Sequence, residues 1–310
     1  MKAVAIENYG DSDVMKLMEL PEPALREDDV LVEVHAAGIN PVDWKIRKGY
    51  MREMIRYEFP LVLGWDLAGV VKKTGPKVRD FKAGDEVYGR PDITRNGSFA
   101  EYVAVSESLI ARKPDNLAFE EAASIPLAGE TAWQALVDTA KVHAGQKVLI
   151  HGGAGGVGSL AIQIGKAVLS AHVAATTSGR NRDFVLRLGA DIAIDYEHQD
   201  FSKLLEDYDA VLDTVGGETL AKSYQVVRKG GILISTVAIP DPEEAKRWGI
   251  KSEFVLLKPD RRKLEELGKR LEEGIIRPVV TRVFTLEEAQ EALELSETQH
   301  VRGKLVIKVR

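Results

Sequence analysis

A glycine-rich stretch near the middle of the chain is the segment whose residue types most clearly suit chemistry. Five glycines occur within HGGAGGVG, residues 151–158. The apolar run KVLI before this stretch is typical of a buried strand, and SLAIQIGKAV after it is typical of a helix. Glycines at such a junction let a ligand approach the backbone closely, and the N–H groups at the start of a helix attract phosphate. The stretch therefore predicts a phosphate-binding turn.

Within this stretch, Gly153, Gly155 and Gly158 form the pattern G-x-G-x-x-G. In dinucleotide-binding βαβ units the first glycine allows a tight turn, the second lets a pyrophosphate approach, and the third lets the helix pack closely on the strand. The pattern stands between a predicted strand and a predicted helix, where this mechanism requires it. We therefore predict a dinucleotide site; the alternative is a tight turn that binds no ligand.

The residues after the next predicted strand indicate which dinucleotide is bound. A site for NAD usually places an acid about 20 residues past the motif, where it binds the ribose 2′-hydroxyl. Here the sequence is SGRNR, residues 178–182, and the nearest acid, Asp183, falls inside the next helix. A hydroxyl and guanidinium groups suit a 2′-phosphate, so we predict NADP(H). The alternative is that Arg180 and Arg182 only cover the solvated start of that helix.

Composition and charge exclude several classes of function. The 310 residues carry a formal net charge of −6 and no basic block, which argues against a nucleic-acid partner. No run of about 18 apolar residues occurs, so no membrane span is expected, and Glu7 interrupts the apolar start too early for a signal peptide. The absence of cysteine excludes disulfides, cysteine-ligated zinc, iron–sulfur clusters and a thiol nucleophile. We expect a cytoplasmic protein.

The elements that must position the glycine turn show two different patterns of apolar and turn residues along the chain. In the first third, short valine-rich runs alternate with Pro and Gly, which favours an antiparallel barrel or sandwich. The strands expected there are 2–7, 30–37, 67–74, 85–89 and 99–105. From about residue 120, apolar runs alternate with helical stretches, which predicts an α/β fold with a doubly wound parallel sheet. The strands expected there are 147–151, 172–177, 191–195, 209–215, 231–236 and 252–257.

The tail after Pro259 contains two more helical patterns and two short strands. Residues 260–274 are amphipathic, and a second helix is expected over 285–297, opening on the capping box Thr285-x-x-Glu288. A tail of about 50 residues is too small for a core of its own. We expect it to return to the first domain.

Several phrases along the whole chain resemble the medium-chain dehydrogenase/reductase superfamily. They are AAGINPVDWKIRKG (36–49), GWDLAGVV (64–71), KAGDEVYG (82–89), GSFAEYVAV (97–105), GETAWQAL (129–136), HGGAGGVG (151–158) and VRGKLVIKV (301–309). The resemblance implies an α/β protein with a GroES-like β-barrel catalytic domain and a doubly wound Rossmann domain. The implied bounds are 1–120 for the catalytic domain, 121–259 for the Rossmann domain and 260–310 for the return to the catalytic domain.

The branch of this superfamily follows from what the chain lacks. Zinc-dependent alcohol dehydrogenases of the superfamily carry a catalytic Cys near the position of Asn40 and a His-Glu pair where Trp65 and Asp66 stand. We cannot assemble the three ligands of a catalytic zinc here, and we expect no metal. NPVDWK resembles the zinc-independent quinone oxidoreductase and enone oxidoreductase branch, which implies NADPH-dependent reduction of quinones or of the C=C bond of α,β-unsaturated carbonyls.

The resemblance also implies site residues. Asn40 and Lys45 would line the cleft for nicotinamide and substrate. Lys45 is the first candidate to stabilise charge on the substrate oxygen and Asn40 the second, while Lys45 as a solvated or ribose-contacting residue is the alternative. The other implied cofactor contacts fall into two sets. Gly155, Gly156 and Val157, within the turn Gly153–Gly158, would hold the pyrophosphate, and Ser178, Arg180 and Tyr196 would surround the 2′-phosphate. Thr131 would contact the nicotinamide end, and Val215 and Thr236 would border the nicotinamide ribose.

The expected partners are a small quinone or enone and a second copy of the chain. Family members often pair through the edge strand of the dinucleotide domain, and residues 232–239 and 252–257 are the apolar edge candidates. Two other functions remain open: an NADPH-binding redox sensor or structural protein with little turnover, and a metal-dependent alcohol dehydrogenase that uses NADP.

Overall fold

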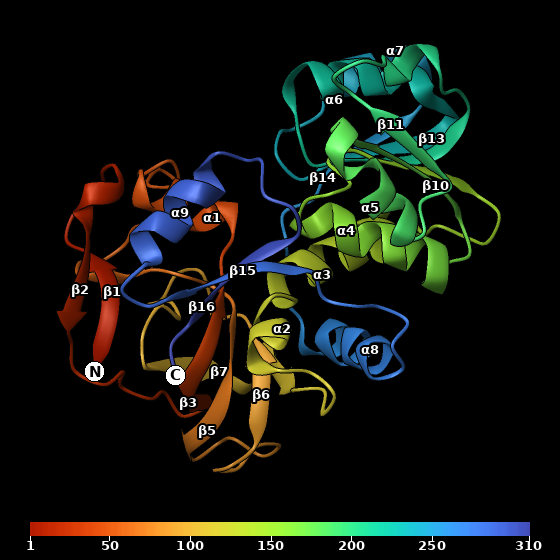
Figure 1. The fold of residues 1–310 in the computed structure, drawn as a ribbon. Coiled ribbons are helices and arrows are strands. Elements are labelled where there is room, and N and C mark those ends of the chain that lie inside the picture. The colour runs from red at the N-terminus through yellow and green to blue at the C-terminus, as the bar shows by residue number, and fades with distance from the viewer. The chain divides into compact units, whose positions relative to one another are not determined.

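The computed structural model describes all residues, 1–310, and the chain divides into two compact units. The first comprises Met1–Leu127, Pro259–Glu273 and Pro278–Arg310, and the second comprises Ala128–Lys258 and Gly274–Arg277. Each unit is built around its own sheet or sheets (Figure 1). The assignment of catalytic and cofactor roles to domains at 1–120, 121–259 and 260–310 stays a prediction.

The first unit holds a three-stranded sheet, β2-β1-β4, and a seven-stranded sheet. In the larger sheet the order is β15-β16-β3-β5-β6-β8, and β7 pairs with β3. Its strands are β1 (Lys2–Ile6), β2 (Met15–Glu19), β3 (Asp29–Gly38), β4 (Leu61–Val62), β5 (Leu67–Thr74), β6 (Glu86–Gly89), β7 (Tyr102–Ser106), β8 (Ile110–Arg112), β15 (Val280–Thr285) and β16 (Lys304–Lys308). All pairs are antiparallel except β15–β16, and β16 joins the C-terminal segment to β3.

Four helices belong to this unit. They are α1 (Pro41–Arg47), α2 (Phe119–Ala123), α8 (Arg261–Glu272) and α9 (Ala289–Glu297). Pro41 opens α1 because the first turn of a helix leaves its N–H unused. The helix α9 contacts α1, and α8 contacts β8.

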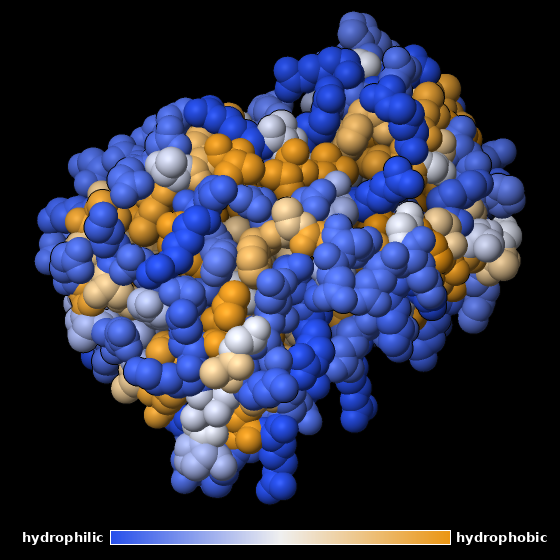
Figure 2. Space-filling model, turned by 60° about the horizontal axis from the view of Figure 1, so that its bottom comes forward, coloured by the Kyte–Doolittle hydropathy of each residue, from blue (hydrophilic) through white to orange (hydrophobic).

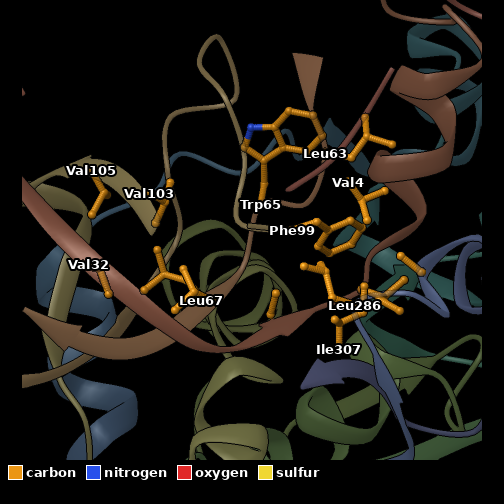
Figure 3. Close-up of a cluster of buried hydrophobic side chains, with 14 of the residues drawn as sticks. Val4, Val32, Leu63, Trp65, Leu67, Phe99, Val103, Val105, Leu286 and Ile307 are labelled. Atoms are coloured by element: carbon orange, nitrogen blue, oxygen red, sulfur yellow. The ribbon is translucent and has the colours of Figure 1, made fainter. Parts of the chain in front are cut away.

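The core of the first unit is mainly one large cluster of buried apolar side chains from most of these strands, and a smaller cluster lies at β1 and β4. Figure 3 shows Trp65 and Phe99 in this cluster, with Leu63 and Val4 beside them. Trp65 is fully buried, and its ring N–H donates to the carbonyl oxygen of Arg95. Burial of the polar ring edge is therefore compensated by a hydrogen bond.

Two sequence predictions in this unit need correction. The strand expected at 99–105 is split, because Phe99 bonds to Val4 of β1 while Tyr102–Ser106 pairs with β3. The helix expected from Thr285 begins only at Ala289. The N–H of Thr285 does donate to Glu288 Oε2 at 2.7 Å, but Thr285 is the last residue of β15, so a turn precedes the helix.

The second unit is a doubly wound parallel sheet, as predicted. Its six strands lie in the order β11-β10-β9-β12-β13-β14, and every pair is parallel. The strands are β9 (Lys147–Ile150), β10 (His172–Thr177), β11 (Ile192–Asp195), β12 (Tyr208–Asp213), β13 (Val227–Ser235) and β14 (Lys251–Phe254). The helices are α3 (Pro126–Trp133), α4 (Gly156–Gln163), α5 (Arg182–Arg187), α6 (Gly217–Ser223) and α7 (Pro242–Trp248). The order reverses at β9, where α/β sheets of this kind bind ligands.

One of the two expected edge segments is internal. Strand β13, which includes residues 232–235 of the expected segment 232–239, lies between β12 and β14, and only β14 forms the sheet edge on that side. None of the helices could span a membrane, because none combines the length and the apolar character that a span requires.

The face of the molecule in Figure 2 is largely hydrophilic, with smaller apolar patches among the polar residues.

Candidate functional site: the glycine turn and the Asn40 network

The glycine turn connects β9 to α4 at the carboxyl edge of the parallel sheet. Gly152, which precedes the G-x-G-x-x-G pattern, takes the left-handed conformation with φ of +67°. Gly153 lies in the same turn, which is closed by a 2.9 Å hydrogen bond from the N–H of Gly155 to the carbonyl oxygen of Gly152. Gly153 is not among the residues with positive φ.

Two glycines of the pattern are required by packing within the unit. A Cβ on Gly153 would lie 2.8 Å from the Cβ of Ala175 in β10. A Cβ on Gly158 would lie 2.3 Å from the carbonyl oxygen of Gly152. Because both distances are shorter than a Cβ contact tolerates, these glycines let α4 and the turn pack against the sheet.

Gly155 is different, because the fold itself hardly requires a glycine there. The one neighbour of a Cβ at Gly155 would be the carbonyl oxygen of Gly152, at 3.3 Å. Gly155 caps α4, and the backbone N–H groups of Gly156, Val157 and Gly158 have no acceptor within the protein. Free N–H groups beside an uncrowded backbone fit a pyrophosphate group. The turn can therefore hold the phosphates of a dinucleotide.

The carboxyl end of β10 carries the residues expected at a 2′-phosphate. Ser178 is buried, whereas Arg180 is exposed and makes no ion pair. Tyr196 follows β11 and is 51% exposed. An unpaired guanidinium and an exposed tyrosine hydroxyl remain available to a ligand. Their role at the cofactor stays a prediction.

An acid that the sequence analysis did not consider lies beside this segment. Asp195 ends β11, opposite Thr177 of β10, and a Cβ on Gly179 would lie 2.7 Å from its Oδ2. Its oxygens already accept from His198 at 2.8 Å and from the N–H of Glu197, and these bonds lower the pKa of Asp195. The sequence could have indicated that Asp195 lies near this segment, because the carboxyl ends of neighbouring parallel strands meet at one sheet edge.

The remaining cofactor candidates of this unit lie near the same sheet edge or in α3. Val215 follows β12 and is exposed, and Thr236 follows β13. Asp213 holds both loops, since it accepts from the N–H of Val215 and from the hydroxyl of Ser235. Thr131 is buried in α3. Contact of these residues with nicotinamide stays a prediction.

In the first unit, the side chain of Asn40 is buried and engaged within the protein. Its Nδ2 donates to Asp66 Oδ2 at 2.8 Å, and its Oδ1 accepts from the ammonium of Lys304. The same ammonium donates to the carbonyl oxygen of Ile39. Asn40 is thus one member of a buried polar network, and its action on a substrate stays a prediction. Lys304, which lies 264 residues away in sequence, was missed because only the fold places β16 beside β3.

Two buried carboxyl groups belong to this network. Burial raises the pKa of Asp66, while Lys304 at 3.4 Å opposes that rise. Burial also raises the pKa of Asp43 to about 7. Asp43 Oδ2 accepts from the N–H of Asn40 at 2.7 Å, so it fixes the first turn of α1.

Lys45 lies on α1 and is half-buried. Its ammonium is 5.6 Å from the centroid of the Trp44 ring and has no carboxylate partner. Burial lowers the pKa of Lys45. Lys48, one turn later, is bound to Glu297 and Asp11. Arg47, the other cation of α1, is fully buried and paired with Glu297 at 2.8 Å, so Lys45 is the cation of this helix that remains available to a ligand.

The three positions that the resemblance compares with a zinc site, Asn40, Trp65 and Asp66, hold an amide, an indole and a carboxylate. Asn40 is engaged with Asp66, and the ring of Trp65 is in the core. One other group, Asp195, Glu197 and His198, has ligand atoms within 4.8 Å of one another. Glu197 and His198 are exposed, and Asp195 already accepts two hydrogen bonds, so this group resembles an ordinary surface turn.

The fold and the glycine turn together define a dinucleotide-binding protein with a second, mainly antiparallel unit. Comparison with family models agrees with this two-unit architecture. Residues 26–115 match the alcohol dehydrogenase GroES-like domain, which confirms the predicted GroES-like domain, and residues 188–307 match the zinc-binding dehydrogenase model.

Similar proteins cover the whole chain. The 2-methylene-furan-3-one reductase of Solanum lycopersicum is 41% identical over 99% of this chain and 79% of its own length. The NADPH-dependent alkenal/one oxidoreductase, chloroplastic, of Arabidopsis thaliana is 40% identical over the same shares. The quinone oxidoreductase structure from Coxiella burnetii is 39% identical, covers 100% of this chain and 99% of its own, and has a TM-score of 0.95. The chain belongs to the medium-chain dehydrogenase/reductase superfamily, in its quinone oxidoreductase branch.

Proposed function

We propose that this protein uses NADPH to reduce quinones or the C=C bond of α,β-unsaturated carbonyl compounds, without zinc. The observation that carries the proposal is the glycine turn, whose three free N–H groups fit a pyrophosphate. The similarity to an enone reductase, an alkenal/one oxidoreductase and a quinone oxidoreductase supports the substrate class.

The chain is an oxidoreductase, and its cofactor is NADP(H), as the sequence predicted. The unpaired guanidinium of Arg180 and the buried Ser178 at the end of β10 suit a 2′-phosphate. NADPH supplies a hydride when it is bound. The turn at Gly155–Gly158 would hold its pyrophosphate, and Asp213 orders the loops that carry Val215 and Thr236.

Lys45 is the residue that we assign to the developing charge on the substrate. Reduction of an enone places negative charge on the carbonyl oxygen, and a cation beside that oxygen stabilises the transition state. The ammonium of Lys45 has no carboxylate partner and is partly shielded from water by burial. Both conditions strengthen its interaction with an anion. Asn40 is the second candidate, although its amide is already bonded to Asp66 and Lys304.

Zinc independence rests on the residues at the position of the metal site. Asn40, Trp65 and Asp66 stand there, and Asp66 is paired with Lys304. The ammonium group of Lys304 lies beside the carboxylate of Asp66, so it occupies the place that a metal cation bound to this carboxylate would take. Metal analysis of the purified, active protein tests this point, and stoichiometric zinc would contradict it.

We also propose a homodimer that pairs through β14. This strand forms one edge of the six-stranded sheet and carries Phe254, which is 38% exposed; Leu256 just beyond it is 56% exposed. The unpaired backbone groups of an edge strand favour pairing with a second strand, Phe254 and Leu256 would add apolar contact, and a twofold axis makes the contact self-complementary. A monomer mass in light scattering at micromolar concentration would contradict the proposal. A cytoplasmic location stays a prediction.

The deciding experiment is a turnover screen. Quinones, alkenals and enones are each mixed with the protein and with NADPH or NADH, and the cofactor absorbance is followed. The proposal expects turnover with NADPH for at least one of these classes. NADPH binding without turnover of any of them would favour the alternative, a redox sensor or structural protein with little turnover.

A further inference from the structure

His151 is the residue directly before the glycine turn, and it is fully buried. Burial lowers its pKa to about 3, so the ring is neutral at ordinary pH. Phe201 packs edge-on against the ring with 4.5 Å between ring centroids. A neutral imidazole in an apolar site needs one donor and one acceptor to satisfy its two nitrogens.

The hydrogen-bond partners of the ring determine which nitrogen carries the proton. Ser223 Oγ donates its single hydrogen to the carbonyl oxygen of Thr219 at 2.7 Å. It must therefore accept at its 3.0 Å contact with His151 Nε2, so Nε2 carries the hydrogen. It follows that Nδ1 is the acceptor, and that Thr176 Oγ1, 3.0 Å from Nδ1, donates to it.

This direction of bonding leaves the hydroxyl oxygen of Thr176 free to accept from the turn. The N–H of Gly152 points to Thr176 Oγ1 at 3.4 Å, and the N–H of Gly153 donates to the carbonyl oxygen of Thr176 at 2.9 Å. The carbonyl oxygen of His151 accepts from the hydroxyl of Thr214 at 2.8 Å. The backbone just before the free N–H groups is therefore held on two sides, by Thr176 of β10 and by Thr214, which follows β12; β10 and β12 flank β9 in the sheet.

We propose that His151 is a positioning residue for the cofactor: by accepting the hydroxyl hydrogen of Thr176, it orients that hydroxyl to hold the Gly152–Gly153 turn in the conformation that binds pyrophosphate. The proposal rests on NADP(H) binding and not on the substrate. Its test is a binding measurement, so its failure is distinguishable from failure of the proposed reductase activity.

Two substitutions of His151 separate the two halves of the ring. His151→Asn places a carbonyl oxygen near the position of Nδ1 and keeps the acceptor for Thr176. His151→Gln places an amide N–H near the position of Nε2 and keeps the donor for Ser223. The proposal expects His151→Gln to weaken NADPH binding about tenfold, the equivalent of one hydrogen bond. His151→Asn should stay within about twofold of the parent.

A second pair of substitutions tests the partners. Thr176→Val keeps the shape of the side chain and removes the hydroxyl, so it should weaken NADPH binding as His151→Gln does. Ser223→Ala removes the acceptor that keeps the ring hydrogen on Nε2, so the hydrogen can move to Nδ1 and NADPH binding should weaken in this variant too. His151→Asn, which keeps the acceptor for Thr176, is the matched control. This pair decides the question if either variant of His151 does not fold.

The readouts are the dissociation constants of NADPH, from its fluorescence, and of adenosine 2′-monophosphate, which lacks the pyrophosphate. Thermal unfolding of each variant is measured in parallel. A loss confined to NADPH supports positioning of the turn. An equal loss for both ligands, or losses that follow the unfolding temperature across all four variants, would overturn the proposal and leave His151 as a packing residue. Unchanged NADPH affinity in Thr176→Val would overturn it as well.

Discussion

The side-chain amide of Asn40 is bonded to the carboxylate of Asp66, with 2.8 Å between Asn40 Nδ2 and Asp66 Oδ2. The residues are 26 apart in sequence: Asn40 lies between β3 and α1, and Asp66 lies just before β5. With Lys304 on the amide oxygen as well, the amide has two of its bonding positions satisfied inside the protein. This relationship makes Lys45, whose ammonium has no carboxylate partner, the first residue to test for catalysis.

Replacement of Lys45 by Met should lower kcat with enones by about two to three orders of magnitude, the usual cost of losing one donor to a developing oxyanion. NADPH affinity should stay near the parent value. The matched control is Lys48→Met, because Lys48 lies on the next turn and is bound to Glu297. Quinones should lose less activity, since their reduction needs less electrostatic help. If Lys45→Met instead raises the NADPH dissociation constant with kcat intact, Lys45 contacts the cofactor.

Replacement of Arg180 by Ala should weaken NADPH binding by about 1–3 kcal/mol, the range of a charge-assisted contact with the 2′-phosphate. NADH binding should hardly change, because NADH lacks that phosphate. Arg187→Ala is a suitable control, since Arg187 is an exposed arginine in the last turn of α5. Titration of both cofactors by fluorescence measures the effect. Equal losses for NADPH and NADH in Arg180→Ala would refute the assignment.

Two glycine substitutions should separate cofactor binding from folding. Gly155→Ala meets only the carbonyl oxygen of Gly152, at 3.3 Å, so it needs a shift of a few tenths of an ångström and should destabilise the fold much less than Gly158→Ala. It should bind NADPH at least tenfold more weakly, because the new methyl group would lie where the phosphates approach. Gly158→Ala would place its methyl group 2.3 Å from the same oxygen and should lower the unfolding temperature. Binding and thermal unfolding are measured for both. Unchanged NADPH affinity in Gly155→Ala would count against a pyrophosphate at this turn.

The raised pKa of Asp43 makes a prediction for stability against pH. Burial raises this pKa to about 7, and the nearby carboxylate of Asp66 adds to the rise. Between its unfolded pKa of about 4 and its folded pKa, the folded state holds a proton that the unfolded state has released. The contribution of Asp43 to stability is therefore complete below pH 4 and is lost as the pH rises to about 7.

Asp43→Asn should remove this loss, because the amide oxygen can still accept from the N–H of Asn40. Relative to the parent, the variant should become more stable as the pH rises from 4 to 7, and the difference should level off above pH 7. Urea unfolding of both proteins across this range measures the difference. A difference that does not vary with pH would show that Asp43 ionises normally in the folded protein.

Much of the second unit could be predicted from the sequence, because its signals are local. The six strands were recognised as short apolar runs between helical stretches, and the parallel sheet follows from that alternation. The glycine turn was recognised in the same way, since a phosphate-binding turn needs a strand, glycines and a helix start within a few residues. Such features depend only on residues close together in the sequence, so they can be predicted from the sequence alone.

What only the tertiary structure decided are relationships between residues far apart in the chain. The bond between Lys304 and Asn40 spans 264 residues and exists because β16 pairs with β3. The edge position of β14 depends on the order of strands in space, and the approach of Asp195 to Gly179 depends on the register of β10 against β11. Composition and spacing do not encode these contacts individually, because strand order and register are set by packing of the whole sheet. The sequence by itself therefore determined the kind of cofactor turn and the class of fold, and the tertiary structure decided which polar side chains are engaged inside the protein and which remain free for a ligand.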